Sequence, residues 1–89
     1  MSNWKFVTNH GAVLLTIYQE PQITGRDLAN RLKITERSVQ TIVRDLAEAG
    51  YIHIGKVGRK NAYSVHEDQR MRHPQLLDKN VIDLLNALS

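Results

Sequence analysis

Two periodic apolar stripes between residues 24 and 50 constrain the fold of this 89-residue chain more than any other feature. The first stripe has the spacing of one helical face and consists of Leu28, Ala29 and Leu32. The second follows i, i+3, i+4, i+7 without a break and consists of Val39, Ile42, Val43 and Leu46. Thr24 and Thr35 each precede a stripe and can cap a helix. With Lys33-Ile34 as the turn, the pattern predicts two short amphipathic helices joined tightly.

The second of these helices, expected over residues 36–49, also has a polar stripe opposite its apolar one. At the same helical spacing this stripe presents Arg37, Gln40, Thr41 and Arg44. Arg and Gln side chains can read guanine and adenine edges, and Thr can meet a thymine methyl or a phosphate. A helix with this face, held by a short partner helix, is typical of a helix-turn-helix that reads DNA. The alternative interpretation is an ordinary solvated polar face.

The positive charge is concentrated in the same part of the chain. The net charge is only +3, but residues 26–61 hold eight basic and four acidic residues, whereas the remainder holds four basic and five acidic ones. A localised positive excess is the electrostatic footprint of a nucleic-acid partner. An accidental bias of a charged, solvated surface is the alternative.

The composition excludes several other classes of function. The chain has no cysteine, so it can form neither a disulfide nor a thiolate zinc site. Its histidines lack metal-ligand spacing; they are His10, His53, His66 and His73. No nucleophile–base pair indicates catalysis, and we expect no cofactor and no enzymatic activity. The longest apolar run, Ala12–Leu15, is too short for a membrane span, and no signal peptide is recognisable, so we expect a cytoplasmic protein.

The amino-terminal segment is expected to supply one further helix to the core. Trp4 and Phe6 are expected to cover one edge of that core. Thr8 or Asn9 can cap the helix, because either side-chain oxygen can accept from an orphan backbone N–H. Residues 22–23 could form a minimal strand before the helix pair.

After Gly50 the apolar period changes from 3.6 to 2, which indicates strands over residues 51–54 and 62–65. The intervening residues 55–61 form a glycine-bearing hairpin loop with three cations, Lys56, Arg59 and Lys60. Such a loop after a helix-turn-helix can lie along phosphates or insert Arg59 into a narrow minor groove. A basic hairpin that merely keeps the chain soluble is the alternative.

Further contacts to DNA are expected around the helix pair. Thr24 and Arg26 lie at the start of the first helix, where backbone N–H groups favour phosphate. For Arg31, an i, i+4 pair with Asp27 is the better interpretation. The complete predicted set is Thr24, Arg26, Thr35, Arg37, Ser38, Gln40, Thr41, Arg44, Lys56, Arg59, Lys60 and Asn61, the last with an equally good structural role in the turn.

Residues 67–89 are expected to form a polar connector and a carboxy-terminal helix, outside a head of residues 1–66 that folds without them. From Gln75 onward this helix has an apolar stripe over about three turns. The stripe consists of Leu77, Val81, Leu84, Leu85 and Leu88. It can form the seam of a homodimer or fold back onto the head, and the heptad-like spacing favours the dimer.

The chain resembles the winged helix-turn-helix transcriptional regulators of the MarR/ArsR type between Asn9 and Val65. The resemblance is carried by N-H-G-A-V-L-L-T-I, then R-D-L-A-N-R-L-K-I-T-E-R-S-V-Q-T-I-V-R-D-L-A-E-A-G-Y-I, and the G-R-K-N-A-Y of the wing. It implies a head of helix, strand, two helices and two strands, with wing contacts from Lys56 to Lys60, and a homodimer on a pseudo-palindromic site. The chain lacks the long dimer helices of larger members and the cysteines of the metal sensors, so the resemblance leaves open whether it binds an effector.

We therefore expect an α+β, mostly helical protein: a three-helix core, a hairpin wing of two to three strands and a carboxy-terminal amphipathic helix. Its predicted function is sequence-specific binding of double-stranded DNA as a transcriptional regulator. A protein-docking module is the alternative from another class, although docking would not need cations on both wing and helix. Binding of RNA or single strands would favour exposed stacking aromatics, whereas the neighbours of Tyr18, Tyr51 and Tyr63 indicate core positions.

Overall fold

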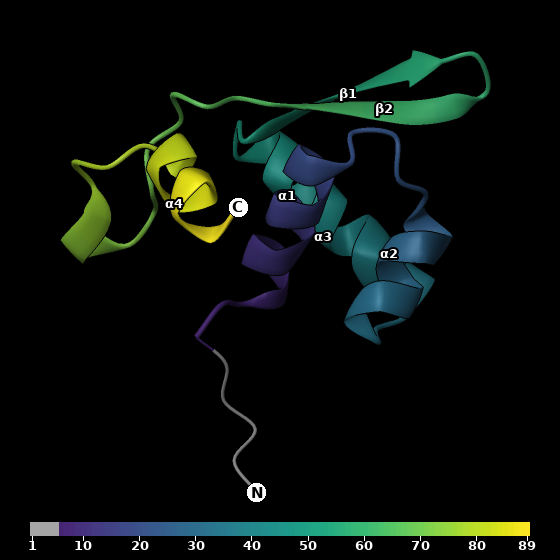
Figure 1. Cartoon of the computed structure of the whole chain (residues 1–89), viewed down its shortest axis with the longest axis horizontal. Helices are drawn as coiled ribbons and strands as arrows, with labels where there is room; N and C mark the ends of the chain where they lie inside the picture. Colours follow the sequence, from purple (N-terminus) through teal and green to yellow (C-terminus); the bar gives the residue numbers. More distant parts are fainter. Residues whose placement is uncertain (1–5) are drawn as a thin grey trace, which may run out of the picture.

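The chain folds into three helices, a β-hairpin and a fourth helix (Figure 1). The computed structural model describes residues 6–89. Its elements are α1 (Asn9–Gln19), α2 (Gly25–Leu32), α3 (Glu36–Glu48), β1 (Ile52–Val57), β2 (Lys60–Val65), the 3-10 helix η1 (Pro74–Leu76) and α4 (Val81–Leu88). This order and the predominance of helix confirm the predicted winged-helix architecture.

A threonine side chain caps each of the first three helices, as predicted. Thr8 Oγ1 accepts from the Gly11 amide at 3.2 Å. Thr24 Oγ1 and Thr35 Oγ1 each accept from the backbone amide three residues further along the chain, at 3.1 and 3.0 Å. Each cap satisfies an otherwise unpartnered amide in the first turn. Between α2 and α3, Lys33 adopts the left-handed conformation with φ of 56°, which makes the turn short.

One hydrophobic core joins the helices to the base of the hairpin. The two predicted stripes face inward, since Leu28, Ala29, Val39, Ile42, Val43 and Leu46 are all buried, and Leu32 is half-buried against them. Val13 and Ile17 of α1 fill the centre and are completely buried. Because α3 is apolar only on its inner side, its other face is left at the surface.

The hairpin is longer than the sequence predicts, and its loop is shorter. β1 and β2 pair antiparallel from Ile52↔Val65 to Val57↔Lys60, so only Gly58 and Arg59 form the turn. Gly58 has φ of 63°, a conformation that favours glycine in two-residue hairpin turns. The prediction of a loop over residues 55–61 is therefore wrong.

Two predictions for the amino-terminal half differ from the structure. Residues 22–23 form no strand, and within residues 6–89 the sheet has two strands. Residues 21–22 form a turn instead, and the Tyr63 amide donates to the Pro21 carbonyl at 2.8 Å. Phe6 is 93% exposed, so it does not cover the core, and Trp4 lies outside the described residues.

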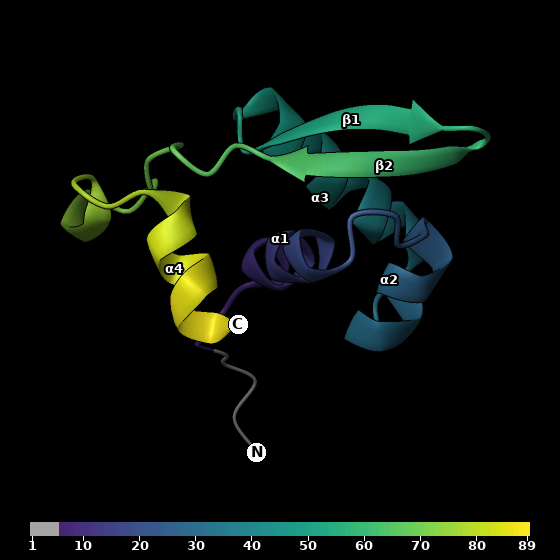
Figure 2. The ribbon, with the colours of Figure 1, turned by 45° about the horizontal axis from the view of Figure 1, so that its top comes forward.

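The last helix begins at Val81 rather than at Gln75. Pro74 starts the short helix η1, and Asp83 Oδ2 accepts from the Asn80 amide at 3.1 Å to begin α4. α4 packs on α1, on the side opposite α2 (Figure 2). Val81 and Leu85 are each 1% exposed and belong to the core of their own chain. Leu77 and Leu88, by contrast, are 52% and 42% exposed, so the predicted stripe is divided between core and surface.

Hydrogen bonds fix the connector to the end of α3 and to the start of α4. The Gln69 side chain donates to the Ala49 carbonyl at 3.0 Å, and the Val81 amide donates to the Gln69 carbonyl at 2.7 Å. Tyr51 donates its phenolic O–H to the Arg70 carbonyl. Burial raises the pKa of Tyr51 above its ordinary value, and the nearby Arg72 guanidinium partly opposes this shift. The connector is thus part of the packed structure.

Candidate nucleic-acid interface

The outer face of α3 presents the polar stripe predicted from the sequence. The helical period explains this exposure: the four buried apolar residues of α3 point into the core, so the polar residues on the opposite side of the helix point outward. Its exposed members are Arg37, Gln40, Thr41 and Arg44. All four project from the first three turns of a 13-residue helix. An α-helix with one exposed face of this kind fits the major groove of double-stranded DNA.

One flank of α3 borders a groove shared with α2 and the hairpin. Its polar lining includes Arg26 from the first turn of α2, Glu36, Gln40 and Arg44 from α3, and Asn61 from β2. The structure therefore brings together predicted site residues that are up to 35 positions apart in the sequence.

The tip of the hairpin lies on the side of α2 (Figure 1), and residues near this tip border the start of that helix. Lys56, Lys60 and Asn61 lie on the two strands, and Arg59 lies in the turn. All four border a hollow that Thr24 also lines. The wing cations and the amino-terminal turn of α2 therefore face the same space, as a phosphate-binding surface requires.

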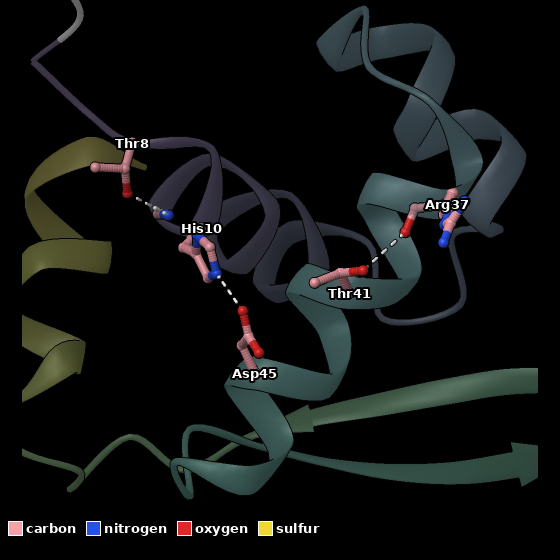
Figure 3. A network of polar contacts seen from close by, with 6 residues as sticks. Thr8, His10, Arg37, Thr41 and Asp45 are labelled. Atoms are coloured by element: carbon pink, nitrogen blue, oxygen red, sulfur yellow. Dashed lines mark hydrogen bonds and ion pairs between the residues drawn. The ribbon is translucent and has the colours of Figure 1, made fainter.

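The other flank of α3 faces the start of α1. Arg37, Ser38 and Thr41 line a shallow pocket there together with Asn9 and His10. The Thr41 hydroxyl donates to the Arg37 carbonyl at 3.2 Å (Figure 3). Its proton is thereby used inside the helix, so that only its oxygen and methyl group remain for a ligand.

Two of the predicted residues are bonded to each other at the start of α3. Thr35 Oγ1 accepts from the Ser38 amide and donates to Ser38 Oγ at 2.9 Å. Thr35 is therefore committed to the helix cap, while the Ser38 hydroxyl keeps a proton to donate. Both residues are exposed.

Two of the acidic residues that flank the polar face, Glu36 and Asp45, contact basic side chains of other helices. His10 Nε2 of α1 lies 2.9 Å from Asp45 Oδ2 of α3 (Figure 3). Arg26 Nε of α2 lies 3.5 Å from Glu36 Oε1. In both pairs the two partners come from different helices, so no spacing within one segment could have indicated them. Sequence reasoning missed both pairs.

Arg31 forms an ion pair with a different carboxylate from the one predicted. Its guanidinium lies 2.7 Å from Glu20 Oε2 at the end of α1, rather than on Asp27 one turn away. The prediction of an Arg31–Asp27 pair is wrong, because α1 brings a second carboxylate within reach of α2. Arg31 thus joins α2 to the end of α1.

Apart from Arg26, the cations of the candidate interface form no such pair in the described part of the chain. Within residues 6–89 the ion pairs are those of His10, Arg26 and Arg31, so neither the exposed arginines of α3 nor the wing cations take part in one. These unpaired cations are Arg37, Arg44, Lys56, Arg59 and Lys60. Positive charge that the protein leaves unpaired on one surface is available to an anionic partner.

A family model described as "Winged helix-turn-helix DNA-binding" matches residues 8–53, just over half of the chain. The match covers the three helices of the core and the first residues of β1. No curated protein and no solved structure matches the chain significantly. Across the part of the chain that the structure describes, no helix is long and apolar enough to cross a membrane. In the same residues, no three His, Asp or Glu side chains are grouped closely enough to hold a metal ion.

Proposed function

Because the chain belongs to the winged helix-turn-helix DNA-binding family, we propose that it is a sequence-specific, double-stranded DNA-binding transcriptional regulator, of the MarR/ArsR type and without enzymatic activity. The observation that carries this proposal is the distribution of paired and unpaired charge. The acids Glu36 and Asp45 of α3 contact basic side chains of other helices, Arg26 and His10, whereas the cations of α3 and of the wing form no ion pair among residues 6–89. A cytoplasmic location is part of the proposal.

In the proposed complex α3 lies in the major groove and its first turns meet the base edges. Arg37 is positioned to read guanine and Gln40 to read adenine, because both side chains can form two parallel hydrogen bonds. Thr41 meets a thymine methyl or a phosphate. Arg44 lies one turn further along and contacts the sugar–phosphate backbone. Ser38 donates to a phosphate on the flank that faces α1.

The wing and α2 hold the backbone on the other flank. Lys56 and Lys60 contact phosphates from the two strands of the hairpin, and Arg59 reaches the minor groove or its edge from the turn. Thr24 and Arg26 contact the same backbone from the start of α2, where free amides favour an anion. Asn61 joins the wing to this surface, and Thr35 supports it by capping α3.

The proposed regulator is a homodimer on a pseudo-palindromic site. Since Val81 and Leu85 are buried within their own chain, the contact between subunits would use the exposed or half-exposed leucines of the same region. These are Leu77, Leu84 and Leu88. Sedimentation at micromolar concentration tests this part, since it predicts a dimer, and a monomer at all concentrations would refute it.

Selection of bound sequences from a random duplex pool by the full chain tests the function itself. We expect a motif with two related halves, because a two-fold dimer reads the same half-site twice. A charge-reversed wing, with Arg59 and Lys60 changed to Glu, serves as the non-binding control. Failure to enrich any duplex would refute the proposal and would favour a protein-docking module instead.

A further inference from the structure

We propose that Glu36 determines specificity in this interface by accepting a hydrogen bond from the N4 amino group of a cytosine in the major groove. The inference rests on the proposed function, because it names a base that the site reads. It adds an acidic residue to a surface that is otherwise described by its cations. Three observations support it: the place of Glu36 in α3, its exposure, and its contact with Arg26.

Glu36 occupies the end of α3 that comes closest to the bases. It is the first residue of the helix, directly after the cap Thr35, and its side chain is 58% exposed. In helix-turn-helix proteins the amino-terminal residues of the reading helix contact the base edges. Glu36 also lies one helical turn before Gln40, and both line the groove between α3 and the hairpin. It is thus a neighbour of a proposed base-reading side chain.

The chemistry of a carboxylate selects its partner in this position. An ionised carboxylate only accepts hydrogen bonds, and DNA phosphates repel it, so near DNA it needs a donor. The donors in the major groove are the amino groups of cytosine and adenine. Cytosine is the favoured partner, because adenine places the acceptor N7 beside its amino group and a carboxylate cannot donate to it. Thymine presents the acceptor O4 and is rejected.

Arg26 positions the Glu36 side chain and still leaves its carboxylate able to accept a hydrogen bond from a base. The two groups approach to 3.5 Å, and the Arg26 side chain is 80% exposed. An exposed ion pair of this kind is weak, so Glu36 can exchange it for a cytosine at small cost. The terminal guanidinium nitrogens of Arg26 can still donate to a phosphate on the same flank. In this arrangement Arg26 is a positioning residue and Glu36 is the residue that touches the base.

Glu48 provides a matched control on the same helix. It lines the same groove as Glu36 and is also exposed. Twelve residues separate the two, or about 18 Å along the helix axis. Removing either charge reduces the repulsion of DNA, but only Glu36 lies at the end that meets the bases. A first-turn acid also stabilises a helix through its dipole, and that role affects stability without affecting base preference.

The test is selection from a random duplex pool with the full wild-type chain and three variants. For Glu36→Gln we expect the preference for cytosine at one position of each half-site to fall at least about fivefold, with a shift towards adenine, which glutamine reads. Glu48→Gln should bind all duplexes more tightly and keep the wild-type motif. Arg26→Gln should bind all duplexes more weakly and show a smaller cytosine preference than the wild type, because it removes the group that positions Glu36. Circular dichroism verifies that each variant is folded.

A second measurement needs no variant. The wild-type chain should lose affinity at least about fivefold for a duplex in which the pyrimidine at this position lacks its 4-amino group. An unchanged motif for Glu36→Gln, or full affinity for that modified duplex, would overturn the role of Glu36 while leaving the proposed function intact. A wild-type chain that selects no motif would overturn both.

Discussion

Replacing Leu85 with alanine should destabilise the whole domain, although this residue lies in the last helix. Leu85 is 1% exposed and packs in the same core as Val13 and Ile17. The substitution removes three carbon atoms, which at about 0.8 kcal/mol for each buried CH₂ gives about 2.4 kcal/mol. The cavity left behind adds to this value, and buried Leu→Ala changes cost about 2–5 kcal/mol. We expect about 3 kcal/mol, a large share of the about 5–15 kcal/mol typical of a small domain.

Leu88→Ala is the control, because Leu88 lies three residues further along the same helix and is 42% exposed. It should cost about 1 kcal/mol or less, since much of that side chain already meets water. Urea denaturation followed by circular dichroism measures both values. Equal effects of the two substitutions, or a loss below about 1 kcal/mol for Leu85→Ala, would refute the placement of α4 in the core of its own chain. Ending the chain at Arg72 should have a still larger effect, in contrast to the folded head expected from the sequence.

Three further predictions concern DNA binding and pH. Arg37→Ala or Gln40→Ala should cost about 1–3 kcal/mol on the selected duplex and much less on random DNA in titrations, and equal losses would assign these residues to the backbone. Arg59→Ala with Lys60→Ala should reduce the slope of log affinity against log salt by nearly two, and an unchanged slope would exclude the wing from the interface. Because burial raises the pKa of Tyr51 above 10.0, the folded state favours the neutral phenol. The neutral Tyr51 phenol therefore stabilises the folded state below pH 10.0, and this stabilisation is lost as the pH rises through the raised pKa of Tyr51. Tyr51→Phe should lose about 1 kcal/mol at neutral pH and be less sensitive to alkali in denaturation, whereas parallel pH profiles would contradict this.

The helices could be predicted from the sequence because their determinants are local. A cap and the amide that it satisfies are three residues apart, as with Thr24 and Asp27, so the pattern and the contact lie in the same short segment. The apolar stripe of α3 is equally local, and its residues are buried as predicted. A period of 3.6 residues also fixes which side of the helix is left exposed, and hence the polar face of the candidate site.

The hairpin and the last helix show where local pattern fails. Gly55 in the sequence suggests the start of a loop, but in the structure it pairs with Ala62 in the middle of the ladder. Strand length is set by the partner strand, which no single segment specifies. Likewise, the spacing of Val81 and Leu85 shows that one face of a helix is apolar but does not show which surface covers it. α1 covers that face, and only the tertiary structure shows this.

The pairing of charged side chains also depends on tertiary structure, and this pairing determines which side chains of the site are available to a ligand. Sequence spacing predicts a pair of Arg31 with Asp27, but because α1 and α2 cross, Arg31 forms an ion pair with Glu20 instead. The crossing of α1 and α3 likewise brings His10 into contact with Asp45. Helix packing therefore decides which acids contact a basic side chain of the protein and which cations remain for a ligand. Because the interface depends on that division, the composition of the chain indicates the class of partner, whereas the tertiary contacts decide which side chains can meet it.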